Sequence, residues 1–116
     1  MIAVIFEVEV PERSAPEYLA HAEALRAELE HSDGFHSIER FRSLANPERL
    51  LSLSFWRDED AVTRWRNHEG HRLAQEAGRG GIFRDYRLRI AAVVRDYGLA
   101  ARREQAPADS RRRHGA

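Results

Sequence analysis

The stretch from residue 51 to residue 98 constrains the fold most, because the spacing of its apolar residues changes twice. Residues 50–56 alternate as a strand does, residues 58–77 have helical spacing, and residues 82–96 alternate again. Asp58 has the position and chemistry of an N-cap, and three glycines before the last strand predict a turn. A strand, a helix and a long strand in this order form one β-α-β unit.

The first part of the chain repeats the pattern. Residues 2–10 alternate as a strand, and residues 14–32 have the spacing of a helix. Ser14, Pro16 and Glu17 predict that this helix begins with a capping box and an early proline. These residues supply the β-α portion of a second unit.

Residues 35–43 read as a strand with an irregular pattern. Phe35 and Phe41 are expected on one face, and Ile38 on the other. An Asn-Pro turn then leads into the next strand, so the two strands are expected to pair as a hairpin.

The complete order is β-α-β-β-α-β. We therefore predict an α+β fold, a ferredoxin-like antiparallel sheet with both helices on one face. Residues 1–98 form this single domain, and residues 99–116 are expected to be a disordered polar tail because they lack apolar periodicity.

The second face of the predicted sheet has mixed character. It is expected to carry Ile5, Trp56, Ala91 or Val93, whereas a sheet face left in water is normally polar. Stacking two such sheets about a two-fold axis would bury these side chains. The sequence therefore predicts a homodimer, with the long last strand reaching the partner's sheet.

The composition excludes several kinds of site. The 116 residues carry zero net charge, so nothing in the overall charge favours nucleic acid as a partner. All 19 basic residues are arginine, and there is no cysteine, which excludes disulfides and thiolate chemistry. No membrane span or signal peptide is visible, so we expect a cytoplasmic protein that does not bind membranes.

The chain resembles the antibiotic biosynthesis monooxygenase (ABM) domain family over residues 2–98. The features that carry the resemblance are GFHSIERF, LLSLSFW, the acidic helix start DEDA, Trp65, His71, IFRDYRLRI and VVRDYG. The resemblance implies a dimeric α+β barrel with a ligand cavity between sheet and helices in each subunit. The family includes cofactor-free oxygenases of aromatic polyketides, quinol oxygenases and haem-degrading enzymes.

Two histidines compete for the catalytic position. On a straight helix His68 shares a stripe with Trp65, whereas His71 points away. Gly70 weakens the helix there, and the resemblance implies a break that turns His71 inward. We therefore assign His71 as the catalytic residue and His68 to ligand binding, with a structural role on the surface as the alternative for each. His21 reads as a solvated helix residue.

The remaining site residues follow from the chemistry of a flat ligand. Trp65 and Phe83 are expected to hold an aromatic ring, and Tyr86 to extend that wall. Arg40 is expected to orient a phenolate or carboxylate. With His71 as base, these residues predict cofactor-independent monooxygenation of a phenol or quinol, with no metal. The alternative is a non-catalytic small-molecule-binding or stress-associated dimer.

Haem degradation fits less well. The haem-degrading members of the family resemble one another in a tryptophan of the second helix, which Trp65 matches. They also share a histidine ten residues later, where this chain has Gln75. Their strand-one asparagine corresponds to Glu7 here. Two of the three positions differ, so a haem-degrading enzyme of that type is not expected.

Overall fold

A computed structural model describes residues 1–67, 81–105 and 107–108. The main elements, in chain order, are β1 (Ile2–Glu9), α1 (Ala15–Leu29), β2 (Phe35–Arg42), β3 (Arg49–Trp56), α2 (Glu59–Arg66) and β4 (Asp85–Ala92). Short 3₁₀ turns precede α1 and follow β4, at η1 (Glu12–Ser14) and η3 (Arg103–Gln105). This order confirms the predicted β-α-β-β-α-β arrangement.

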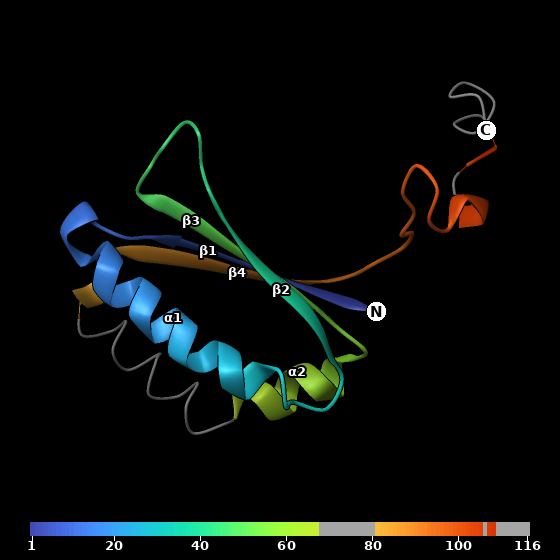
Figure 1. The fold of residues 1–116 in the computed structure, drawn as a ribbon, viewed down its shortest axis with the longest axis horizontal. Coiled ribbons are helices and arrows are strands. Elements are labelled where there is room, and N and C mark those ends of the chain that lie inside the picture. The colour runs from blue at the N-terminus through green and yellow to red at the C-terminus, as the bar shows by residue number, and fades with distance from the viewer. Residues whose placement is uncertain (68–80, 106, 109–116) are drawn as a thin grey trace.

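The four strands form one sheet in the order β2-β3-β1-β4, and every neighbouring pair is antiparallel. Figure 1 shows α1 and α2 on the same side of this sheet. The fold is therefore ferredoxin-like, with one face under the helices and one open face. Within the described ranges, no helix has both the length and the apolar character needed to cross a membrane.

The strand β3 faces the opposite way from the sequence prediction. The register aligns Val4 of β1 with Ser54 and Ile90, so the two serines and Trp56 lie on the face beneath the helices. The prediction that placed Trp56 on the open face is therefore wrong. The indole Nε1 donates a hydrogen bond to Ser54 Oγ at 2.9 Å, and only 2% of Trp56 is exposed. Burying the large Trp56 ring with its N–H hydrogen-bonded stabilises this orientation more than burying three smaller apolar side chains would. Those three side chains lie on the open face instead: Leu51, Leu53 and Phe55.

A bulge in β2 separates Phe35 from Phe41. The pairing of β2 with β3 is irregular between Phe35 and Ser37, which moves Phe35 to the helix side. There its ring meets Trp56 edge to face, with the ring centroids 5.3 Å apart. Phe41 lies on the open face and is 43% exposed. The prediction that these two phenylalanines share a face is wrong, because one extra residue reverses the alternation.

The two helix starts differ in their capping. Asp58 is an N-cap as predicted, since its extended backbone lets Oδ1 accept a hydrogen bond from the Ala61 amide at 2.9 Å. Ser14 makes no side-chain cap, so the predicted capping box is not formed. Its backbone already has helical angles, because the η1 turn runs directly into α1.

The last strand is shorter than predicted. β4 ends at Ala92, and one further backbone hydrogen bond joins the Val93 amide to the Met1 carbonyl at 3.0 Å. The pairing stops there because β1, its only neighbour in the sheet, begins at Ile2. Figure 1 shows the chain then running away from the sheet. Within the expected tail a turn and η3 lie before residue 106, and residues 106 and 109–116 lie outside the described ranges.

Substituting Gly34 with alanine is expected to destabilise the domain by about 1–3 kcal/mol. Gly34 has a φ of 85°, and an added Cβ would lie 2.5 Å from Ala61 Cβ, where α2 passes the end of α1. Thermal unfolding of Gly34→Ala should be compared with that of Gly98→Ala, where an added Cβ meets nothing within 4 Å. Equal melting temperatures would show that the α1–β2 turn adapts without cost.

Candidate functional site

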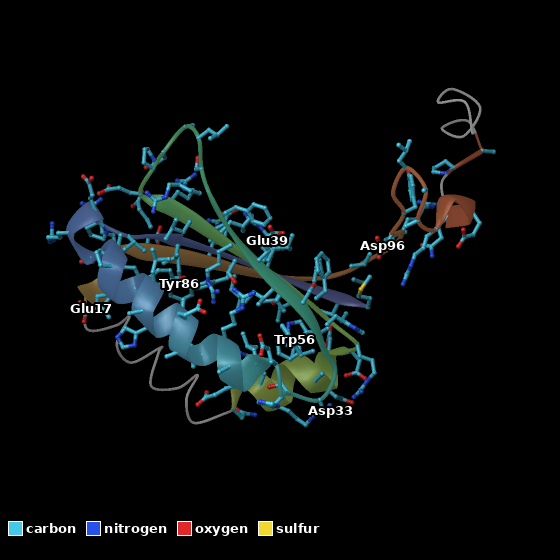
Figure 2. All side chains as sticks on the ribbon, viewed as in Figure 1. Glu17, Asp33, Glu39, Trp56, Tyr86 and Asp96 are labelled. Carbon is cyan, nitrogen blue, oxygen red and sulfur yellow. The ribbon has the colours of Figure 1, made fainter. Side chains whose placement is uncertain are left out.

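A cavity of about 440 Å³ lies between the sheet and the helices. All four strands and both helices contribute side chains to it. Figure 2 shows Trp56 near α2 and Tyr86 beside α1, both on the helix side of the sheet. Most of the lining is apolar, and the volume suits a small organic molecule.

The end of the cavity near α2 is built from tryptophan rings. The centroids of Trp56 and Trp65 are 6.4 Å apart, with their planes tilted by 33°. Trp65 comes from the buried side of α2, which also presents Ala61 and Val62 to the core. The helical spacing of these residues is what places the second ring over the first.

The other end of the cavity is also aromatic. Phe83 meets Tyr18 of α1 and Tyr86 of β4 edge to face, at centroid distances of 6.4 and 5.9 Å. Phe6 of β1 lies 5.8 Å from the Tyr86 ring. Aromatic faces and edges at both ends can hold a flat ligand.

Arg40 is the charged side chain on the sheet floor of the cavity. It lies opposite Ser52 in the register of β2 and β3, and one Nη donates to the Ala22 carbonyl at 3.5 Å. Its Nε is buried and has no hydrogen-bond partner among the described residues. Burial raises the pKa of Tyr18, and the nearby charge of Arg40 partly offsets that rise.

Four of the site residues chosen from the sequence line the cavity: Trp65, Phe83, Tyr86 and Arg40. His68 and His71 lie outside the described residues. One residue that the sequence reading set aside, His21, is exposed and also lines the cavity. The sequence could have indicated this position, because His21 follows Tyr18 by three residues and therefore lies on the same side of the helix, next to Ala22.

Glu7 is placed where it cannot serve the cavity. Its side chain lies on the open face of the sheet, where its carboxylate accepts a hydrogen bond from Arg89 at 3.1 Å. Gln75, the second position that differs from the haem-degrading branch, lies outside the described residues. Across the ranges that the structure covers, no group of three or more His, Asp or Glu side chains could hold a metal ion.

Comparison with known proteins gives consistent results. The family model described as antibiotic biosynthesis monooxygenase matches residues 1–77. The jasmonate monooxygenase ABM of Pyricularia oryzae is 47% identical over 94 residues, which cover 81% of this chain and 44% of that protein. The uncharacterized protein YqjZ of Bacillus subtilis is 32% identical over 93 residues, 80% of this chain and 79% of that protein.

Solved structures share the fold at low identity. A Deinococcus radiodurans protein described as a candidate antibiotic biosynthesis monooxygenase has a TM-score of 0.78 and 13% identity, covering 85% of this chain and 98% of its own. Rv0793 of Mycobacterium tuberculosis has a TM-score of 0.74 and 17% identity, covering 84% and 98%. With the family match over residues 1–77, these likenesses lead to one conclusion: the chain belongs to the antibiotic biosynthesis monooxygenase family.

Proposed function

We propose that the protein is a cofactor-independent monooxygenase that acts on an electron-rich aromatic small molecule, a phenol or a quinol. The observation that carries the proposal is the cavity of about 440 Å³ with aromatic rings at both ends. Membership of a monooxygenase family supports the reaction type. A relative named as a jasmonate monooxygenase supports a small organic molecule as the substrate, although this chain spans less than half of that relative.

The reaction needs a base and a dry site. Removing the proton of a phenol gives an electron-rich anion, which can pass one electron to O₂; recombination of the two radicals forms a peroxide. Loss of water from that peroxide leaves one oxygen atom in the product as a carbonyl. We propose His71 as the base, with His68 beside the substrate. His21, on the described wall of the cavity, is the competing base.

We also propose that the protein works as a homodimer joined through the open sheet face. Leu51, Leu53 and Phe55 lie there half-buried, beside Phe41 at 43% exposure and Ile5. Apolar side chains from three strands therefore meet on a face that neither helix covers. A second copy of the chain stacked on this face would remove the patch from water in both subunits.

The base is tested by oxygen uptake with a panel of quinols and polycyclic phenols. Substituting His71 with alanine should lower the rate by about 10²–10⁴-fold, the usual contribution of a general base. His21→Ala tests the competing base, and His31→Ala, beyond the end of α1, is the matched control.

A large loss of oxygen-uptake rate in His21→Ala, with no loss in His71→Ala, would identify His21 of α1 as the base. Wild-type protein that binds the panel without consuming oxygen would overturn the enzymatic proposal and favour a small-molecule-binding role.

A further inference from the structure

Arg40 is held in an unusual setting for a guanidinium group. It reaches the cavity from β2, one of the two edge strands, and its one protein hydrogen bond in the described ranges is the long 3.5 Å contact with the Ala22 carbonyl. Its Nε has no partner there, and no ion pair joins Arg40 to a carboxylate in those ranges. A buried donor without a partner is costly, so such a group calls for an explanation.

Among the described residues, the other polar groups around the cavity do not neutralise this charge. Among the residues that the structure describes, the lining includes no aspartate or glutamate, but it does include the cationic or protonatable side chains Arg66 and His21. The remaining polar side chains there are hydroxyl groups from Tyr18, Tyr86 and two serines. The described wall therefore offers positive charge and hydrogen-bond donors to whatever fills the space.

Ser52 is a second polar side chain at the same place in the cavity. It is the register partner of Arg40, it faces the cavity, and its hydroxyl has no hydrogen-bond partner among the described residues. Ser54, the other serine on this floor, is already engaged with the Trp56 indole. Arg40 and Ser52 are neighbours in the strand register and both line the cavity, so a guanidinium and a hydroxyl are both available there to an oxygen anion.

We propose that the cavity recognises its ligand through an anionic oxygen, a carboxylate or a phenolate, which pairs with Arg40 and accepts a hydrogen bond from Ser52. The apolar body of the ligand then lies along the sheet floor against the aromatic rings. This proposal rests on the proposed function in taking the cavity as the substrate site, and it narrows the substrate to a hydrophobic acid.

The test measures calorimetric binding of two probes of nearly equal shape, 2-naphthoate and naphthalene-2-carboxamide, at neutral pH. The wild-type protein should bind the carboxylate at least about tenfold more tightly than the neutral amide, as expected for a charge-assisted hydrogen bond. Arg40→Gln should remove this preference, and Arg40→Lys should keep part of it because the charge is retained.

Arg42→Gln is the matched control. Arg42 lies on the same strand and the same face, is exposed, and does not line the cavity, so the preference for the anion should survive.

A second probe, 2-naphthol, distinguishes a phenolate from a carboxylate. If Arg40 holds a phenolate, the pKa of bound 2-naphthol, followed by its absorbance, should fall in the wild type and return in Arg40→Gln.

A preference for the carboxylate, or a lowered naphthol pKa, each lost in Arg40→Gln, supports the proposal and names the anion. Equal affinities for acid and amide with an unchanged naphthol pKa would overturn the anion site while leaving an apolar ligand cavity intact. Failure of the wild type to bind any of the three probes would overturn the anion site and the proposed cavity function together. The comparison of carboxylate and amide binding by the wild-type protein tests the anion site even if Arg40→Gln does not fold.

Discussion

Replacing Trp56 with alanine is expected to lower the free energy of unfolding by about 3–5 kcal/mol. Trp56 is among the largest fully buried side chains, and its ring contacts Phe35 of β2 and Trp65 of α2, so it joins the sheet to that helix. The substitution leaves a void under α2 and deprives Ser54 of its buried hydrogen-bond donor. Urea unfolding followed by circular dichroism measures the loss.

Two variants make the Trp56 result interpretable. Leu44→Ala changes a fully exposed loop residue and should leave the urea midpoint where it is. Trp65→Ala removes a ring that is 9% exposed and lines the cavity, so it should weaken ligand binding as well as lower stability. A change below about 1 kcal/mol in Trp56→Ala would contradict its place at the centre of this core cluster.

Introducing arginine at Leu53 is expected to give monomeric or insoluble protein. Leu53 lies in the middle of the open face, between Ile5 of β1 and Glu39 of β2. In the proposed dimer the new charge would be buried between two sheets, and an unpaired buried charge typically costs several kcal/mol. Sedimentation velocity of the wild type and of Leu53→Arg at the same concentration gives the oligomeric state.

The control for this experiment is Leu44→Arg, which adds the same charge on a loop that is fully exposed. Its sedimentation should match that of the wild type. A wild-type protein that sediments as a monomer of 13.4 kDa would overturn the proposed dimer. The fold and the cavity would stand in that case, because both lie within one chain.

The order of the elements could be predicted because each strand and helix carries its own period. β1 and β4 alternate cleanly, and one face of β4, with Tyr86, Leu88 and Ile90, lines the cavity, as was predicted for Tyr86. In α2, Trp65 and its neighbours at helical spacing are buried as expected. Local spacing was sufficient here because a single face of each element is covered.

The orientation of β3 could not be predicted in the same way. Both of its faces carry large apolar side chains, so counting them does not tell which face the helices cover. The deciding contact is Trp56 with Ser54 and Trp65, and Trp65 comes from a different element. The bulge at Phe35 is likewise set by pairing with β3, which a single strand's sequence does not reveal.

The cavity was predicted only in part for a related reason. Arg40, Phe83 and Tyr86 were chosen for their chemistry, and the fold brings them to one space. His21 was set aside because an isolated histidine on a helix is usually solvated, yet α1 lies along the cavity and presents it there. Which residues share a cavity depends on how helices lie over a sheet, and this is a property of packing.

The closeness of Trp56 and Trp65 has an optical consequence. They are the only two tryptophans in the chain, and their ring centroids lie 6.4 Å apart at a tilt of 33°. At this separation the excited states of the two indoles couple, which produces paired circular-dichroism bands of opposite sign. Because both rings line the cavity, a ligand that slides between or against them would change the sign or size of that couplet. The protein thus carries its own unlabelled chromophore pair at the place where binding is expected.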